Sequence, residues 1–126
     1  MKEIVPYTEA ELKLLKLIGR DMADDIPDQH EKEAEFVISR SVQYDGYEGK
    51  YTGWMLQGKM HGKGRLVSKM WGGSRYDGLW KDHTMHGKGR LMRYNGAYAY
   101  QGMWANDKRS SPMTEYFASG EVKKLL

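Results

Sequence analysis

The sequence contains the heptapeptide Met-His-Gly-Lys-Gly-Arg-Leu twice, at residues 60–66 and again at residues 85–91. In a chain of 126 residues, identity over seven positions at a fixed offset of 25 residues indicates a tandem duplication. Repeats with periods of roughly 20–50 residues form solenoids or stacked hairpins, in which each unit contacts its neighbours. Such arrays build extended surfaces rather than enclosed pockets. The duplication therefore directs the functional question towards partners that lie against a surface.

A second pattern precedes each copy of the heptapeptide and has the two-residue period of a β-strand. Tyr76, Gly78 and Trp80 fall on one face of such a strand, and Tyr-x-Gly recurs at residues 51–53 and 100–102. The heptapeptide supplies the return strand, with glycine and leucine on one face and lysine and arginine on the other. Each unit is therefore predicted to be a β-hairpin.

Glycines at alternate strand positions favour a sheet of one layer. A glycine leaves a hole above its strand, which an aromatic ring on a neighbouring strand can cover. Gly-Gly at residues 72–73 and Asn-Gly at residues 95–96 supply turns between units, the latter suited to positive φ at both positions. The predicted fold class is mainly β, an elongated single-layer antiparallel sheet of stacked β-hairpins with an N-terminal α-helical segment.

The N-terminal third follows the helical period instead. Thr8 and Glu11 form a capping box, and a run of leucine and isoleucine follows until Gly19. A second helix is predicted from about Pro27 to Val37, with proline in its first turn. We therefore divide the chain into a helical leader at residues 1–40 and a β-ribbon at residues 41–126, with units starting near residues 51, 76 and 100.

Charge is distributed unevenly between these parts. Residues 1–35 carry ten acidic and five basic side chains, whereas the rest carries seven acidic and fifteen basic ones. An acidic leader and a basic body can dock on each other or on different partners. The absence of cysteine excludes disulfides and thiolate metal sites and fits a reducing compartment. The longest apolar stretch, at residues 12–18, is too short to span a bilayer, and the N-terminus resembles no targeting signal.

The repeated residues resemble the MORN repeat (membrane occupation and recognition nexus), whose pattern is Tyr-x-Gly-x-aromatic, a later Gly, and His-Gly-x-Gly. The unit at Tyr76 matches closely except that His83 replaces the later glycine. In the unit at Tyr51, Met55 takes the aromatic position and Trp54 lies one residue early. The third unit begins correctly at residues 100–104, but Asp107 replaces the glycine and Ser-Ser-Pro replaces His-Gly, so it is degenerate. The resemblance covers roughly residues 47–124.

The resemblance implies an extended, curved ribbon of antiparallel hairpins. Proteins with such repeats are mostly scaffolds and adaptors, in ciliary and cytoskeletal assemblies or at membrane junctions. Some carry a fused lipid kinase or methyltransferase domain, for which this chain has no room.

Two apolar surfaces are candidates for binding another protein. The first is an aromatic trough able to hold an amphipathic helix, although its rings can equally serve to fill glycine holes; it comprises Tyr51, Trp54, Tyr76, Trp80, Tyr100 and Trp104. The second is the leader helix, which is apolar around most of its circumference and packs either on its own ribbon or on a partner; its candidate residues are Leu14, Leu15, Leu17 and Ile18.

A basic stripe is the candidate for an anionic membrane surface. Its side chains are expected to point outward from adjacent hairpins: Lys63, Arg65, Lys88 and Arg90. Each cation near an anionic leaflet contributes about 1 kcal/mol, so four would bind weakly. An ordinary solvated face is the alternative interpretation of this stripe, and nucleic acid is an improbable ligand.

Catalytic and metal-binding signatures are not apparent in the sequence. His61 and His86 are interpreted as repeat residues that support the turns, and the His-x-x-His spacing at residues 83–86 falls in a hairpin. No catalytic residues, metal or cofactor are predicted, and the protein is not expected to be an enzyme. We expect a structural or adaptor subunit that binds other protein subunits in an intracellular, cytoplasmic setting, with the cytoskeleton or cilium favoured. The alternative is a peripheral module that binds anionic phospholipid.

Overall fold

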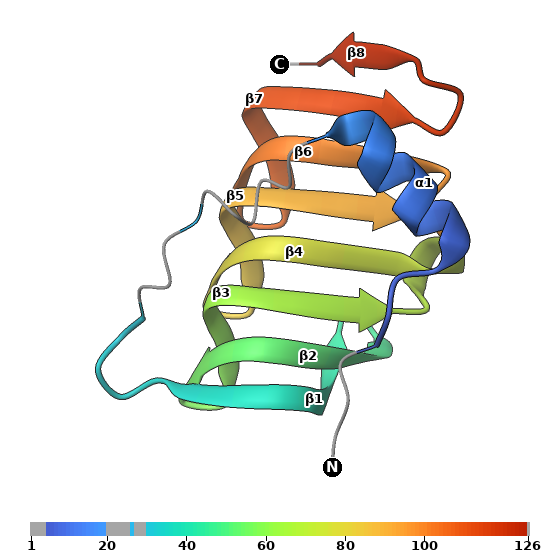
Figure 1. The fold of residues 1–126 in the computed structure, drawn as a ribbon. Coiled ribbons are helices and arrows are strands. Elements are labelled where there is room, and N and C mark those ends of the chain that lie inside the picture. Colours follow the sequence, from blue (N-terminus) through green and yellow to red (C-terminus); the bar gives the residue numbers. More distant parts are fainter. Residues whose placement is uncertain (1–4, 20–25, 27–29, 126) are drawn as a thin grey trace.

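All eight strands of the described structure belong to one antiparallel sheet, in which each strand pairs with its neighbours in sequence (Figure 1). The computed structural model describes residues 5–19, 26 and 30–125. The elements are α1 (Glu9–Ile18), β1 (Glu35–Tyr44), β2 (Tyr47–Leu56), β3 (Lys59–Ser68), a 3₁₀ turn η2 (Met70–Gly72), β4 (Ser74–Lys81), β5 (Thr84–Arg93), β6 (Tyr98–Ala105), β7 (Lys108–Phe117) and β8 (Val122–Lys124). This arrangement confirms the predicted ribbon of stacked hairpins with an N-terminal helix.

A row of glycines crosses the middle of the sheet. Gly53 pairs with Gly64, Gly64 with Gly78, Gly78 with Gly89, and Gly89 with Gly102, so the row spans five consecutive strands from β2 to β6. Backbones without side chains on these positions leave a groove across the sheet, and the aromatic rings of the repeats lie in it.

The tyrosines that open the first two repeats each lie over a glycine of the following strand. A Cβ atom at Gly64 would overlap the phenol ring of Tyr51, and one at Gly89 would overlap that of Tyr76. The two hydroxyls continue past the glycines and donate to the backbone, that of Tyr51 at 2.7 Å to the carbonyl of Trp54. The predicted covering of glycine holes by rings is therefore confirmed.

Tryptophans connect one unit to the unit before it. The indole nitrogen of Trp80 donates to the carbonyl of Gly64 at 3.3 Å, and that of Trp104 donates to the carbonyl of Gly89 at 3.0 Å. Each ring also makes edge-on contacts with tyrosines of the repeat array, with the centroids of Tyr76 and Trp80 4.9 Å apart. Because both contacts recur with the repeat, neighbouring hairpins are fixed to one another by the same geometry.

The repeat histidines support turns, as predicted. His61 accepts at Nδ1 from the backbone N–H of Asp82 at 3.3 Å, and His86 accepts in the same way from Asn106 at 3.2 Å. Both donors have positive φ, in the turn that closes the following hairpin. Each histidine therefore holds the turn of the next unit.

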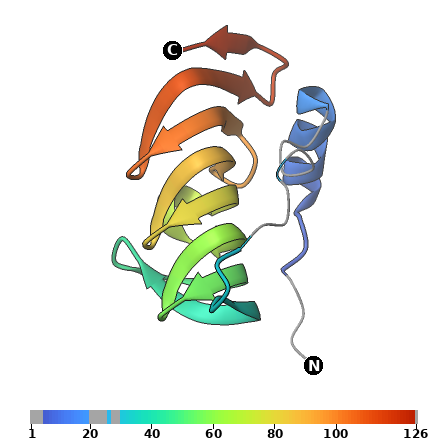
Figure 2. The same cartoon turned by 90° about the vertical axis from the view of Figure 1, so that its left-hand side faces the viewer.

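The N-terminal arm, which we define as residues 5–19, packs on one side of the sheet (Figure 2). Its helix α1 is capped at the N-terminus by Thr8, whose side chain forms the predicted capping box with Glu11, and at the C-terminus by Gly19, which has φ +86°. Leu14 is completely buried against Met92. The arm therefore covers its own ribbon. Of the two alternatives for the helix, packing on its own ribbon or on a partner, the structure shows the first.

Two expectations about the leader differ from the structure. Residues 30–34 form no helix, and β1 already begins at Glu35, so the second helix predicted from Pro27 to Val37 is wrong over its described part; residues 27–29 lie outside the described residues. The strand also begins six residues before the expected start near Ser41. The reason is that Val37 pairs with Gly53 and covers the row of glycines at its first strand, which outweighs a weak helical period.

Candidate functional site

The two faces of the sheet carry different chemistry. We call the face that bears the repeat tyrosines the aromatic face and the opposite face, on which α1 lies, the arm face. Side chains alternate between the faces along every strand. Arg75, Asp77 and Arg90 therefore share the arm face, whereas Tyr76 and Leu91 lie on the aromatic face.

A buried ion pair attaches the arm to the sheet. Glu11 accepts two hydrogen bonds from Arg75, from Nε to Oε2 and from Nη2 to Oε1, both at 3.1 Å. Arg75 also donates at 2.8 Å to each of the carbonyls of Val5 and Pro6, and its guanidinium lies 4.4 Å from the ring centroid of Tyr7. A forked, two-point contact of this kind fixes position and orientation together.

A second cluster of charges lies beside this pair. Asp77, which is 3% exposed, is 3.0 Å from Nη2 of Arg65 and 3.7 Å from Nη2 of Arg90. The hydroxyl of Tyr7 is 3.2 Å from Arg90 Nη2 and 3.5 Å from Asp77 Oδ2. The acidic leader and basic body thus meet within one chain at Glu11 and Arg75, while Tyr7 joins the second cluster.

These contacts change the interpretation of the basic stripe. Strand alternation does place Lys63, Arg65, Lys88 and Arg90 on one face, but Arg90 is 1% exposed and does not point into solvent. Arg65 is paired with Asp77, and Lys63 donates to the carbonyl of Ile26 at 3.4 Å. The expectation that all four face outward is therefore wrong, because the arm and Asp77 occupy this face.

The aromatic trough is largely filled by its own rings. Tyr51, Tyr76, Trp80, Tyr100 and Trp104 share the aromatic face and are at most 8% exposed. Burial raises the pKa of the Tyr51 and Tyr76 phenols well above the ordinary value. These rings therefore serve the packing of the ribbon rather than forming an empty apolar groove.

Trp54 does not belong to this set. It lies on the arm face, where its ring stacks on His30 with centroids 3.5 Å apart and meets Phe36 edge-on at 5.3 Å. The cause is its position one residue before the aromatic position, which Met55 occupies on the aromatic face. The prediction that Trp54 lines the trough is therefore wrong, because consecutive residues of a strand face opposite sides of the sheet.

The predicted residues of the leader helix divide between the sheet and solvent. Leu14 is buried, and Leu15 and Ile18 are partly buried in the same cluster. Leu17 is 51% exposed, and Leu12, which was not among the predicted residues, is 49% exposed. An apolar surface thus remains on the outside of the docked helix.

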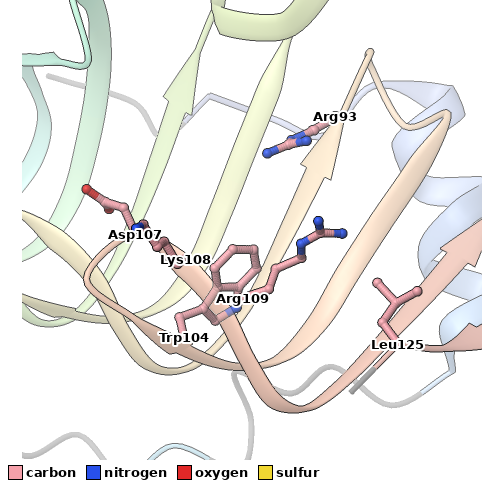
Figure 3. A pocket seen from close by; sticks show the side chains of 6 residues that line it. All are labelled: Arg93, Trp104, Asp107, Lys108, Arg109 and Leu125. Atoms are coloured by element: carbon pink, nitrogen blue, oxygen red, sulfur yellow. The ribbon is translucent and has the colours of Figure 1, made fainter.

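The sequence did not predict an open hollow at the C-terminal end of the aromatic face. Its volume is about 510 Å³, and it is lined by Arg93, Trp104, Asp107, Lys108, Arg109 and Leu125 (Figure 3). Oδ1 of Asp107 accepts from the hydroxyl of Tyr44 at 2.5 Å and from the backbone N–H of Met85 at 2.7 Å. The available signal was the departure of the third unit from the repeat pattern, which begins at Asp107.

Metal binding finds no support in the part of the chain that is described. No group of three or more His, Asp or Glu side chains there is arranged to hold an ion. None of the described helices is long and apolar enough to cross a membrane.

The comparison with protein families identifies the repeats. The model of the MORN repeat matches residues 51–72, 76–98 and 100–122, which together make up slightly more than half of the chain. These three matches begin at the tyrosines that open the three predicted units. The chain matches no curated protein. By its repeats, the chain belongs to the MORN-repeat family.

Proposed function

We propose that the protein is a non-enzymatic structural or adaptor subunit that mediates contacts between proteins in a larger assembly. MORN repeats occur widely in proteins that bind other proteins or membranes, and they are generally structural rather than catalytic. The observation that carries the proposal is the apolar surface left on the docked helix. Leu12 and Leu17 are each about half exposed although the same helix already buries Leu14. A docked helix with further apolar side chains is suited to a second contact.

The setting we propose is a cytoskeletal or ciliary complex in the cytoplasm. This rests on the setting of other proteins with such repeats.

Protein binding is favoured over membrane binding by the condition of the basic stripe. With Arg90 buried and Arg65 paired, Lys63 and Lys88 remain as its exposed or half-exposed cations. Two cations near an anionic leaflet contribute about 2 kcal/mol, which is weaker than millimolar binding. A bilayer contact through this stripe would require the arm to leave the face first.

The experiment compares the native size of tagged wild-type protein with that of Leu12→Glu/Leu17→Glu in extracts of the source cell. Because both side chains are exposed, the variant is expected to keep its circular dichroism spectrum and to lose co-sedimentation with the larger particle. Val122→Glu is the matched control, since Val122 is an exposed apolar residue of β8, at 54%. Wild-type protein that sediments at its monomer size in native extract would contradict the adaptor proposal. Flotation of wild-type protein with anionic vesicles, lost on Lys63→Glu/Lys88→Glu, would favour the membrane alternative.

A further inference from the structure

The arm packs on the sheet through contacts that are separate from the core of the ribbon. The large buried cluster on the aromatic face extends from β1 to β7 and includes no described residue of the arm. Leu14 belongs to a second, small cluster on the arm face, together with Met92 and Ala99. Figure 2 shows α1 beside the sheet rather than among its strands. The arm can therefore leave the sheet while the ribbon keeps its own packing.

The face beneath the arm is shaped to receive a helix. The turn between β5 and β6 passes close to the helix backbone, because a Cβ atom at Gly96 would lie 2.7 Å from the backbone nitrogen of Glu11. The missing side chain at Gly96 allows the first turn of α1 to approach the sheet. Met92 and Ala99, both 0% exposed with the arm in place, form the surface against which Leu14 packs.

Polar contacts fix the register of the bound helix. Arg75 donates two hydrogen bonds to the carboxylate of Glu11 and two more to backbone carbonyls of the arm. The ring of Tyr7 lies 4.4 Å from the same guanidinium, and its hydroxyl is 3.2 Å from Nη2 of Arg90. The face therefore recognises an aromatic residue, a carboxylate four residues later and an apolar residue three residues after that.

These contacts are specific, but the stability they contribute is modest. A buried ion pair adds little net stability, because desolvation of the two charges offsets their attraction. A helix of ten residues is marginal in water, so docking must also fix its conformation. Leu14 is the fully buried leucine of α1, while Leu12 and Leu17 stay about half exposed. A longer helix that is already folded would lose less entropy on binding to the same face, and it would displace the arm.

We propose that the arm face binds an amphipathic helix of a partner protein, and that the arm occupies this face until such a helix displaces it. The partner helix carries a tyrosine, a glutamate and a leucine at the spacing of Tyr7, Glu11 and Leu14. The inference rests on the proposed adaptor function and specifies the chemistry of one partner. The docked arm presents the apolar surface at Leu12 and Leu17, whereas the surface proposed here opens when the arm leaves.

The test measures fluorescence anisotropy of a labelled peptide with the sequence of residues 5–19, added to the full chain. Leu14→Asp weakens docking of the chain's own arm and leaves the sheet unchanged. This variant is expected to bind the peptide at least about tenfold more tightly than the wild type, in which the arm competes. Leu12→Asp is the matched control, since it places the same residue on the exposed side of the same helix; its affinity should lie within about twofold of the wild type. Glu11→Gln frees the face by a second route and is also expected to bind the peptide more tightly than the wild type.

The contact with Arg75 is tested from both sides. A second peptide, in which glutamine replaces the glutamate equivalent to Glu11, is expected to bind Leu14→Asp about tenfold more weakly, because a hydrogen bond to a charged group is lost. When Arg75→Met is added to Leu14→Asp, the two peptides are expected to bind equally, since the guanidinium that distinguishes them is gone.

Equal affinities of the wild type, Leu12→Asp and Leu14→Asp for the first peptide would overturn the proposal, because the arm would then not compete for the peptide's site. Failure of both Leu14→Asp and Glu11→Gln to bind it would overturn the proposal as well. Vesicles containing phosphatidylserine serve as the second probe: vesicle binding by Leu14→Asp, without peptide binding, would replace the partner helix by a membrane.

The outcomes also separate this inference from the function on which it rests. If the peptide fails to bind while the native particle in the source cell persists, this inference fails and the adaptor function stands. If the peptide binds as expected but the wild type sediments at its monomer size in native extract, the adaptor function fails and the helix-binding surface stands.

Discussion

Glu11→Gln removes the negative charge from the buried contact of the arm while keeping the helix cap. Glutamine also closes a capping box, so the hydrogen bond between the side chain of residue 11 and the backbone of Thr8 is retained. What is lost is a carboxylate that accepts two hydrogen bonds from Arg75, with both side chains at most 5% exposed. The amide of glutamine offers one acceptor and presents an N–H to the guanidinium.

The expected cost follows from the burial. Removing one partner of a buried ion pair destabilises a protein by about 3–5 kcal/mol, because the other charge stays buried and unpaired. The arm can limit this loss by leaving the sheet, which exposes Leu14 at a cost of about 1.5–3 kcal/mol for a fully buried leucine side chain. We therefore expect the free energy of unfolding to fall by about 2–5 kcal/mol.

Urea denaturation followed by tryptophan fluorescence measures this change. A smaller m-value in Glu11→Gln would indicate an arm that is already undocked in the native state. Glu9→Gln is the matched control on the same helix: Glu9 is 4.0 Å from Lys13 and both side chains are largely exposed, so no measurable change is expected. Adding Arg75→Met to Glu11→Gln should recover part of the stability, since the unpaired charge is gone. A Glu11→Gln protein as stable as Glu9→Gln would refute the reasoning.

Three further predictions concern the ribbon. Gly64→Ala should destabilise the fold by about 1–3 kcal/mol because its Cβ overlaps the ring of Tyr51, and the cost measured by urea denaturation should shrink in a Tyr51→Ala background. Trp104→Phe should cost about 1–3 kcal/mol, since the Gly89 carbonyl loses its indole donor; a thermal melt equal to that of the wild type would contradict this role. Burial raises the pKa of Tyr51 and Tyr76 above the ordinary 10.0, so their contribution to stability is complete below pH 10 and is lost as the pH rises above that value. Phenolate absorbance should therefore appear together with loss of the circular dichroism signal. Phenolate formation near pH 10 in an intact fold would contradict the burial of these two rings.

The local structure of the ribbon was predictable because its causes are local. Strand alternation places Gly64 and Leu66 on one face, and the Tyr-x-Gly spacing puts a ring above a glycine. The capping box at Thr8 likewise depends on residues within one turn. Each of these features follows from a short stretch of sequence, and each is confirmed.

The sequence could not predict which face of the sheet the N-terminal segment covers. Lys63 and Arg90 share a face by parity, but their burial differs: Lys63 is half-buried and donates to the carbonyl of Ile26, whereas Arg90 is fully buried and contacts Tyr7 of the arm. The charge imbalance between leader and body left two alternatives open, because a count of charges carries no geometry. The position of Trp54, in contrast, could have been predicted. Trp54 lies one residue before the aromatic position of the repeat, and strand alternation alone is sufficient to place it on the arm face.

The C-terminal hollow depends on contacts across several strands. Arg93 and Arg109 are 16 residues apart in sequence and meet because both contact Tyr100 on the strand between them. No period in the sequence signals this meeting, since the third unit departs from the repeat there.

The central claim is that the arm is docked on the arm face of its own ribbon. Hydrogen exchange of the α1 amides in the full chain tests this claim most directly. A helix of ten residues is marginal in water by itself, so its amides are protected only if the arm is docked. The account predicts that amides of residues 12–18 exchange much more slowly than in an unstructured peptide and that Glu11→Gln accelerates them far more than Glu9→Gln does. Amides that exchange in the wild type as fast as in the free peptide would contradict this account, and would leave the arm face open to other ligands.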